Sequence, residues 1–370
     1  MPGSVYGTIF RISTWGESHG DGIGVVVDGC PAGLLLDEED IQTFLDRRKP
    51  GQTKYSTPRK EEDRVRVLSG VFEGRTTGTP ISLIVFNENQ RSDDYSQIAS
   101  FYRPGHADYT YDRKYGFRDY RGGGRSSGRE TIGRVAAGAI AEAILKELGI
   151  KVHAYTKSIG SINIDDQKAG EDPISRGPLS MPDQEASDQA EEYLSEQMKD
   201  HNSAGGIIEC IVKGMPAGIG EPVFDKLDAS LAKAVMSIGA VKGVEIGDGF
   251  EAAGRTGAEN NDAFHYDGKL GQIVKKTNHA GGILGGISDG ADIILRVAIK
   301  PTPSISRPQA TVNKDNENIE IRIQGRHDPI VVPRAVVVVE SMVAITLVDQ
   351  LFLGMTSQME RIIDFYGNHR

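Results

Sequence analysis

Short stretches in which apolar and polar residues alternate recur through the first ninety residues, and this period of two is typical of strands with one buried face. The pattern predicts strands at residues 4–15, 22–27, 64–71 and 80–86. Residues 38–48 break the pattern, with acidic residues first and arginines last, as the helix dipole favours. The first part of the chain therefore predicts several strands and one helix.

The remainder of the chain mixes longer helical segments with further strands. Thr131–Gly149 is rich in alanine and glycine, which suits a closely packed helix, and Arg334–Leu353 is an apolar helix. Residues 164–200 are acidic and carry three prolines, so we expect a peripheral excursion there. Further strands and helices are predicted at 151–162, 184–199, 205–213, 225–239 and 292–299.

Composition is that of a soluble globular protein of 370 residues, long enough for one large domain or two ordinary ones. A net charge of −10 argues against general nucleic-acid binding. Cys30 and Cys210 form no CxxC motif or Cys/His cluster, so we expect no disulfide framework and no metal site, as in a reducing cytoplasm.

Nothing at the start of the chain resembles a signal peptide. The longest apolar run, Ala335–Val348, is interrupted by Glu340 and Ser341 and is too short and too polar to cross a membrane. We therefore expect a protein that neither enters the secretory route nor spans a membrane.

The segment from Tyr102 to Leu145 differs in charge from this acidic background. Between Arg103 and Arg134 it carries eight basic residues and four acidic ones. Glycines 122–124 allow the backbone to approach a ligand closely, and Arg125, Ser126 and Ser127 follow, shortly before the predicted helix. Unpaired N–H groups at a helix start favour anions, so we predict an anion site. The alternative is a solvated basic loop capped by serine.

A second basic stretch covers residues 46–60, with six basic residues and one acidic one. Its prolines and glycine indicate a loop. Loops of this kind over a pocket often close on anionic ligands. A solvated surface loop explains the pattern equally well from the sequence alone.

Glycines are again frequent at residues 239–290, without a dinucleotide fingerprint in a strand–turn–helix setting and without a Walker A motif. Asn278 and His279 among these glycines suggest backbone that lines a flat ligand. Farther on, Gly325-Arg326 precedes Arg334 and an apolar helix, as Gly124-Arg125 precedes Arg134 and its helix. We take this as a possible internal pseudo-repeat, with chance similarity as the alternative.

Three ionisable residues stand on turns flanked by glycine or proline, close in sequence to arginines: His19, His106 and Asp328. Histidine exchanges protons near neutral pH, and arginine forks bind carboxylates and phosphates. The residues alone indicate an enzyme that acts on a phosphorylated, carboxylated small molecule with a phosphate-bearing cofactor. A structural role for each turn histidine is the competing interpretation.

Seven ordered motifs carry the interpretation further. They are GESHG (16–20), RPGHAD (103–108), GGGRSSGRET (122–131), SIGAVKGVEIGDGF (237–250), NHAGGILGGISDG (278–290), KPTPSI (300–305) and GRHDP (325–329). Together they resemble the signature set of the chorismate synthase family, from the first strand to the last helix. The resemblance implies a single domain over residues 1–370.

The resemblance also implies a reaction. Members of this family are lyases of the shikimate pathway of aromatic amino acid biosynthesis. They convert 5-enolpyruvylshikimate 3-phosphate to chorismate and phosphate by an anti 1,4-elimination that requires reduced FMN. A substrate with two carboxylates and a phosphate, beside a cofactor with a phosphate, would account for both basic stretches.

Residue roles follow from the family pattern. His19 would protonate the departing phosphate or its surroundings, His106 would protonate and orient the reduced flavin, and Asp328 would help the flavin to take the proton at C6 of the substrate. Contacts to FMN would come from Arg125, Ser126, Ser127, Gly239, Ala240, Gly285, Lys300, Pro301, Thr302, Pro303, Ser304 and Arg326. The anionic substrate or NADP would be held by Arg48, Lys54, Arg129 and Arg134.

The family resemblance further implies an α+β fold, a β-α-β sandwich with helices between antiparallel sheets, and a cytoplasmic homotetramer. The chain departs from the pattern at Lys54, where arginine is common, and at His201-Asn202-Ser203, where Gly-Asp-Ser is more usual. Two alternatives remain open: a non-catalytic anion- or RNA-binding module that uses the arginine-rich segment, and a flavin reductase that uses NADPH.

Overall fold

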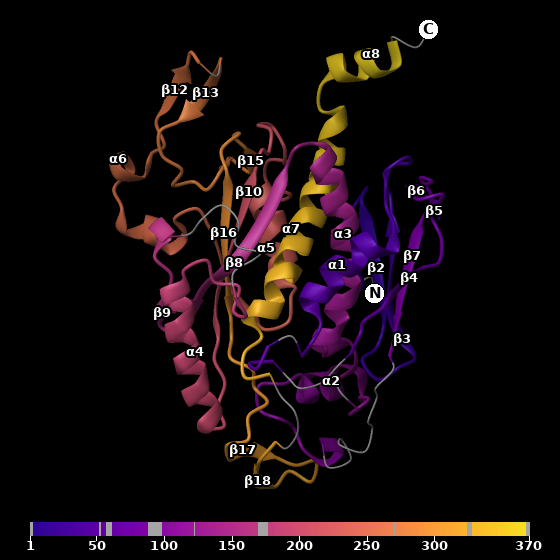
Figure 1. The fold of residues 1–370 in the computed structure, drawn as a ribbon, viewed down its shortest axis with the longest axis vertical. Coiled ribbons are helices and arrows are strands. Elements are labelled where there is room, and N and C mark those ends of the chain that lie inside the picture. The colour runs from indigo at the N-terminus through magenta and orange to yellow at the C-terminus, as the bar shows by residue number, and fades with distance from the viewer. Residues whose placement is uncertain are drawn as a thin grey trace.

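The structure is a computed structural model that describes residues 3–51, 53–56, 61–87, 98–121, 123–168, 177–269, 271–323 and 328–367. Two five-stranded antiparallel sheets form its largest elements (Figure 1). The first has the order β1-β2-β3-β7-β4, with β1 Val5–Tyr6, β2 Arg11–Gly16, β3 Gly22–Asp28, β7 Ile81–Phe86 and β4 Val65–Val67. The second has the order β11-β16-β10-β8-β9, with β11 Val241–Ile246, β16 Ile293–Ile299, β10 Gly206–Lys213, β8 Lys151–Ile159 and β9 Ile162–Asn163.

The first predicted strand, at residues 4–15, is two strands joined by a turn. Gly7 has a φ of +90° there, and a Cβ at this position would lie 2.1 Å from the carbonyl oxygen of Phe10. Only glycine tolerates both conditions, so the chain folds back at this point. The other predicted strands of this sheet lie within two residues of the observed ones, except that β4 is shorter than residues 64–71.

Helices α1 (Glu38–Arg48), α3 (Thr131–Glu147) and α7 (Val332–Leu353) lie between the two sheets (Figure 1). The small residues of α3 permit a close approach to α7, because a Cβ added at Gly138 would lie 2.2 Å from Cβ of Ser341. Sixteen of the 22 residues of α7 are buried. Its burial explains why so apolar a segment is stable inside a protein.

The prediction for the last apolar segment needs a correction. The helical segment Val332–Thr356 is long and apolar enough to cross a membrane by length and composition, but 83% of its apolar window is buried within the protein. The segment is longer than Ala335–Val348 because Val332, Pro333 and residues up to Leu353 continue the helix. Burial, rather than insufficient length, identifies it as a core helix.

Two carboxylates on α7 connect the layers. Asp349 accepts hydrogen bonds from the backbone N–H groups of Thr8, Ile9 and Phe10 at 2.7–3.0 Å. Glu340 accepts from Arg47 of α1 at 2.5 Å and from the backbone of Ala154 on β8 at 2.9 Å. Buried carboxylates with such partners are tolerated in a core, and removal of either would leave the partners unsatisfied.

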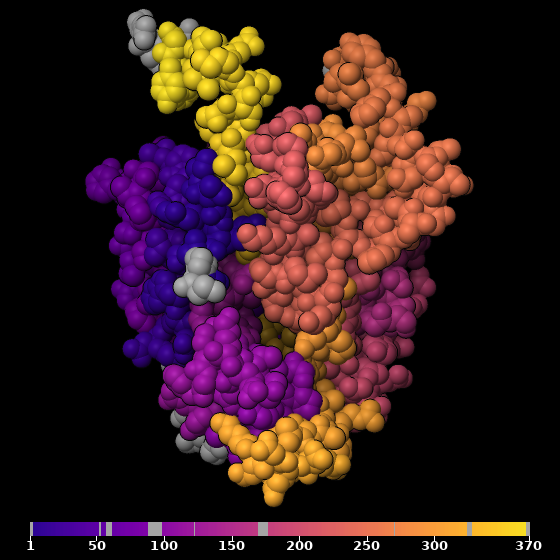
Figure 2. Space-filling model, turned by 180° about the vertical axis from the view of Figure 1, so that it is seen from behind, coloured from indigo at the N-terminus to yellow at the C-terminus, as the bar shows by residue number. Residues whose placement is uncertain are grey.

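Smaller elements surround these layers. The helices are α2 Asp108–Tyr115, α4 Gln184–Lys199, α5 Leu227–Met236, α6 Gly257–Asn260 and α8 Met359–Gly367. The two-stranded sheets are β5 Val71–Phe72 with β6 Arg75–Thr76, β12 Phe264–Asp267 with β13 Gln272–Lys275, β14 Ile283–Leu284 with β15 Ile287–Ser288, and β17 Gln309–Val312 with β18 Asn318–Ile321. Figure 2 shows that α8 and the arm that carries β12 and β13 project from the body.

The mixed helical and antiparallel composition agrees with the predicted α+β class. Of the pseudo-repeat pattern, Gly325 and Arg326 lie outside the described residues. The two helix arginines of the pattern, Arg134 and Arg334, both lie within the first four residues of the helices that meet in the core, α3 and α7.

Candidate active site

His106 lies in a loop before α2 that packs against the segment after β16. Lys300 Nζ donates a hydrogen bond of 2.8 Å to the carbonyl of Gly105. Gly105 has a φ of +71°, and a Cβ there would lie 2.6 Å from Cβ of Pro303. His106 Nε2 lies 2.8 Å from Ser304 Oγ. The structure thus brings the predicted histidine together with the predicted cofactor segment Lys300–Ser304.

The hydrogen bonds of His106 identify its neutral tautomer. Nδ1 lies 2.9 Å from the carbonyl oxygen of Pro104, which can only accept, so Nδ1 carries the proton. Nε2 then accepts from the hydroxyl of Ser304. Burial, followed by the positive charge of Arg103, lowers the pKa of His106 to about 4. The imidazole is therefore neutral at pH 7, with a lone pair at Nε2.

Arg103 and Asp108 hold the two ends of the His106 loop together. The guanidinium of Arg103 donates two hydrogen bonds of 2.8 Å to the carboxylate of Asp108, a bidentate pair. Arg118 Nε lies 3.8 Å from the same carboxylate. Burial alone would raise the pKa of Asp108, but the hydrogen bonds and charge of Arg103 lower it. The loop is therefore fixed by an ionised carboxylate.

Arg125 extends from a short 3₁₀ turn, η2 (Gly124–Ser126), to the first sheet. Its Nη2 donates to Thr14 Oγ1 at 2.6 Å and its Nη1 to the carbonyl of Gly16 at 3.3 Å. Burial is the main cause of the raised pKa of Tyr111 on α2, and the nearby positive charge of Arg125 opposes this rise. This places the Gly16 turn, η2 and α2 side by side.

The two predicted serine ligands close turns in the structure. Ser126 Oγ donates to the carbonyl of Gly123 at 2.7 Å. Ser127 Oγ accepts from the backbone of Arg129 at 3.3 Å and caps a second 3₁₀ turn, η3 (Gly128–Glu130). The sequence placed these residues shortly before a helix start, and the structure shows that two 3₁₀ turns cover this stretch before α3 begins at Thr131.

Glu130 connects the first sheet with two of the predicted arginines. Its carboxylate accepts from Thr14 Oγ1 at 3.0 Å and from Arg134 Nε at 2.8 Å, and lies 3.6 Å from Arg125. It orients both arginines. Glu130 was not predicted as a site residue from the sequence, although its position four residues before Arg134 at a helix start was an available signal.

Arg134 contacts the residue that follows α5, shortly before the predicted cofactor residues Gly239 and Ala240. Its Nη1 donates to Ser237 Oγ at 2.6 Å. The carbonyl of Ala240 accepts from the backbone of Lys300 at 2.9 Å, and Ala240 has a φ of +74°, which is uncommon for a residue with a side chain. Gly239 stands immediately before it. A strained, well-anchored turn therefore lies beside the Lys300–Ser304 segment.

A second cluster contains the predicted anion-binding residues Arg48 and Arg129. Arg48 donates to Asp63 Oδ2 at 2.5 Å, and Arg129 Nη1 lies 3.1 Å from Asp63 Oδ1. The side chain of Asp63 is 0% exposed and that of Arg48 is 2% exposed. Arg129 is also paired with Glu61. Arg48 is therefore buried beneath the site, whereas Arg129 is partly exposed at its edge.

Asp328 joins this second cluster through Arg334 at the start of α7. Arg334 Nη1 donates to Asp328 Oδ2 at 2.6 Å, and its Nε donates to the backbone carbonyl of Arg48 at 3.0 Å. Arg48 in turn lies 3.4 Å from the carbonyl of Gly128 and from Thr131 Oγ1, at the start of α3. The first turns of α3 and α7 therefore meet around Arg48.

His19 stands on the turn between β2 and β3. The side chain of Ser18 lies 3.1 Å from His19 Nδ1. The turn is closed by the backbone of Gly20, which donates to the carbonyl of Glu17 at 3.2 Å. Since Arg125 holds Gly16, the turn borders the same group of residues as Glu130.

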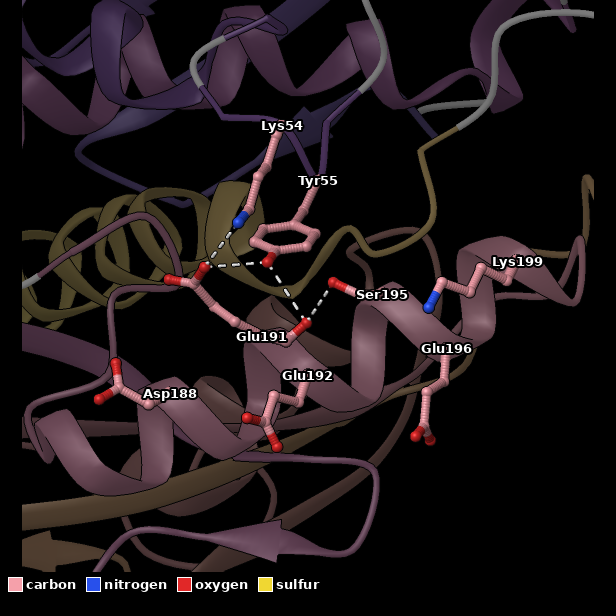
Figure 3. A pocket seen from close by; sticks show the side chains of 8 residues that line it. All are labelled: Lys54, Tyr55, Asp188, Glu191, Glu192, Ser195, Glu196 and Lys199. Carbon is pink, nitrogen blue, oxygen red and sulfur yellow. Dashed lines mark hydrogen bonds and ion pairs between the residues drawn. The ribbon is translucent and has the colours of Figure 1, made fainter.

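Three predicted residues are not brought into this group by the described contacts. Lys54 pairs with Glu191 on α4 at 3.0 Å and lines a pocket of about 470 Å³ whose other ionisable residues are mostly acidic (Figure 3). Gly285 forms the β14–β15 turn, where Gly286 accepts from Leu227 at the start of α5. Arg326 lies outside the described residues.

The position of Gly285 follows from the length of α5. Leu227 begins this helix, and Ser237, which contacts Arg134, follows its last residue. At 1.5 Å per residue these two contacts are roughly 15 Å apart. Gly285 therefore lies at the opposite end of α5 from the Arg134 contact.

Comparisons with known proteins agree on one family. The chorismate synthase family model matches residues 10–352. A protein of Lachnoclostridium phytofermentans named chorismate synthase is 69% identical over 366 residues, 99% of this chain and 100% of that protein. A protein of Methanosarcina mazei with the same name is 55% identical over 354 residues, 95% of this chain and 96% of that one.

A solved structure titled "Crystal Structure of Chorismate Synthase" has a TM-score of 0.74 to this chain, with 31% sequence identity, and the match covers 98% of each chain. These similarities give no support to a non-catalytic RNA-binding module. The chain therefore belongs to the chorismate synthase family, whose members are lyases of aromatic amino acid biosynthesis.

Proposed function

We propose that this chain eliminates phosphate from 5-enolpyruvylshikimate 3-phosphate at the site around the N-terminal end of α3, with reduced FMN as cofactor. The observation that carries the location is the contact between His106 and Ser304. It joins a candidate acid–base residue, which lies near the charge of Arg103, to a lysine-bearing segment. Family membership supports the reaction, and this contact supports the proposed location.

The donors present suit a flavin with a phosphate group. Lys300, Arg125 and the backbone of the turns around them offer positive charge and N–H groups to an anion. In the middle of the segment, Thr302 Oγ1 is buried and has no hydrogen-bond partner among the described residues, although its own carbonyl accepts from Ser203 at 2.6 Å. Buried hydroxyls of this kind usually have a partner, so a further polar group is expected nearby.

Reduced FMN, when bound, would supply an electron-rich ring that assists the elimination without net oxidation. His106 would hold a proton at Nδ1 and accept one at Nε2, because its tautomer is set by Pro104 and Ser304. An anionic ligand nearby would oppose the effect of Arg103 and Lys300 and raise the pKa of this imidazole. His106 would then protonate and orient the cofactor.

His19 would give its proton to the departing phosphate. Arg129 donates to Asn87 beside the His19 turn, and Arg134 donates to Glu130. These two arginines would hold the anionic groups of the substrate. Asp328, kept in place by Arg334, would help to remove the proton at C6. Lys54 would reach an anion, either substrate or NADP, only after its pair with Glu191 opens.

We further propose that the layering of Figure 1 is the β-α-β sandwich of the family, with α3 and α7 as the corresponding helices of a pseudo-repeat. A cytoplasmic homotetramer would cover the exposed apolar residues of the two projections. These residues are Phe264, Tyr266 and Ile273 on the arm, and Met359, Ile363, Phe365 and Tyr366 on α8. Light scattering that gives a monomer at micromolar concentration would reject this assembly.

The function is tested under anaerobic conditions with purified protein, 5-enolpyruvylshikimate 3-phosphate and reduced FMN. We expect chorismate and phosphate in equal amounts, and no product with oxidised FMN alone. Calorimetry should also show tighter FMN binding in the presence of substrate, because each anion orders residues that the other uses. Equal affinity with and without substrate would reject that coupling but not the reaction.

A further inference from the structure

Asn87, the residue that follows β7, makes hydrogen bonds with two parts of the site, the turn that carries His19 and Arg129. Its side-chain Nδ2 donates to the carbonyl of Glu17 at 2.9 Å and to the carbonyl of Gly20 at 2.7 Å. Its Oδ1 accepts from Arg129 Nη2 at 2.8 Å. Its backbone N–H donates to the carbonyl of Asp21 at 3.0 Å.

The sheet explains why Asn87 reaches this turn. Gly22 at the start of β3 pairs with Phe86 at the end of β7, so the next residue along β7 lies beside the turn that carries His19. The two carbonyls that accept from the Asn87 side chain belong to residues two before and one after His19. Both N–H groups of the amide are therefore committed to the backbone on either side of the histidine.

The amide orientation is determined by these partners. With the opposite orientation, the oxygen would face two carbonyl oxygens and the NH₂ group would face a guanidinium, which has only donors. Only the observed orientation satisfies all three partners. The side chain therefore connects the His19 turn to Arg129 in a fixed direction.

Arg129 continues the connection to the buried anion-site residues. Its guanidinium pairs with Glu61 and lies 3.1 Å from Asp63, which also holds Arg48. A change in the position of Arg129 would therefore also affect Arg48, because both arginines contact the carboxylate of Asp63. Asn87 is the described link between this network and the histidine turn.

We propose that Asn87 is a positioning residue for the elimination, which sets the His19 turn relative to Arg129 so that proton donor and bound phosphate meet. This inference rests on the proposed role of His19. The amide touches neither substrate nor cofactor in this account. It acts by holding two backbone carbonyls and one guanidinium.

Two substitutions separate the two ends of the amide. Asn87→Asp keeps an acceptor for Arg129 and removes both donors to the turn. Asn87→Ala removes all three side-chain bonds without adding a charge. We expect kcat per folded enzyme to fall about 10- to 100-fold in both, since a displacement of about 1 Å can cost about 100-fold. We expect KM for the substrate to rise clearly only in Asn87→Ala.

Asn163→Asp is the matched control, because Asn163 is exposed and its Nδ2 donates to the backbone carbonyl of Ser161 at 3.1 Å, away from the site. It makes the same chemical change and should retain normal kcat. If Asn87→Asp also retains normal kcat per folded enzyme, the inference is wrong. A loss shared equally by both Asn→Asp variants would mean a general charge effect and would overturn it as well.

The deciding measurement is a double-mutant cycle with His19→Ala. If Asn87 acts through His19, adding Asn87→Asp to His19→Ala should lower kcat little further. A full additional loss would show an independent role and reject the inference. Near-normal turnover of His19→Ala alone would remove His19 from the mechanism, and the inference with it, while the chorismate synthase reaction itself would stand.

Discussion

His106 Nε2 lies 2.8 Å from Ser304 Oγ, although the two residues are 198 positions apart. The contact gives the histidine a defined tautomer, since Pro104 already accepts the proton of Nδ1. It also attaches the His106 loop to the segment that follows β16. The predicted acid–base residue and the predicted cofactor residues therefore share one hydrogen bond.

Ser304→Ala should lower kcat/KM about 10-fold without unfolding the protein, because Nε2 of His106 would lose the donor that fixes the ring. Steady-state assays on folded enzyme measure this. Ser306→Ala is the control, since Ser306 Oγ donates to the carbonyl of Ile323 at 3.2 Å rather than to His106. An equal effect of both substitutions would contradict a specific role for Ser304.

The protonation of His106 can be tested without substrate or cofactor. Its folded pKa of about 4 lies below the value of an unfolded histidine, so the unfolded chain binds more protons between roughly pH 4 and 6.5. Stability should therefore fall as the pH is lowered through this window. NMR should show a His106 ring signal that does not titrate between pH 6 and 8, and His106→Gln should unfold with a weaker dependence on pH. A ring that titrates near pH 6.5 would contradict the assignment.

Asp63→Asn should destabilise the protein by about 3–5 kcal/mol, the usual cost of leaving a buried charge without its partner. Both Arg48 and Arg129 depend on this carboxylate. Denaturant unfolding gives the change in free energy. Asp28→Asn is the control, since its pair with Arg11 is exposed to solvent and should contribute less than about 1 kcal/mol. Similar losses of unfolding free energy in both variants would contradict a larger stabilising contribution from the buried pairs of Asp63.

A substitution at His201 is expected to stabilise the protein rather than destabilise it. It has a φ of +55°, a left-handed conformation that favours glycine. His201→Gly should raise stability by about 0.5–1 kcal/mol, because relief of strain exceeds the added flexibility of the unfolded chain. His265→Gly, in strand β12, should lower it instead. A stability decrease in His201→Gly would show that the imidazole makes a contact that outweighs the strain.

Sequence patterns predicted the helices and strands well where nearby residues determine where an element begins and ends. Helix α1 begins and ends where the acidic and basic turns indicated, and a capping box between Asp37 and Asp40 explains its start. Helix α3 begins at Thr131 as expected and ends two residues early, because Gly149 adopts a φ of +72°. The motifs of the family gave His106 and Lys300, which the fold then brings together.

Residues whose importance depends on distant partners could not be predicted. Asp63 matters because Arg48 and Arg129 approach it from α1 and η3, and Asn87 matters because β7 ends beside the His19 turn. Neither residue stands in a motif that signals this. Similarly, nothing near Lys54 in sequence indicates that Glu191, on a helix more than a hundred positions later, would pair with it.

The central claim is that the site at the start of α3 carries out the elimination, with His19 and His106 in separate roles. Chorismate formation by His19→Ala and His106→Ala tests this claim most directly. The measured quantity is the anaerobic rate per folded enzyme with reduced FMN bound. We expect each variant to lose about 100-fold or more, the scale of a general acid–base residue. A rate near that of the unaltered protein in either variant would contradict the account of that residue, and such a rate in both would remove this site from the reaction.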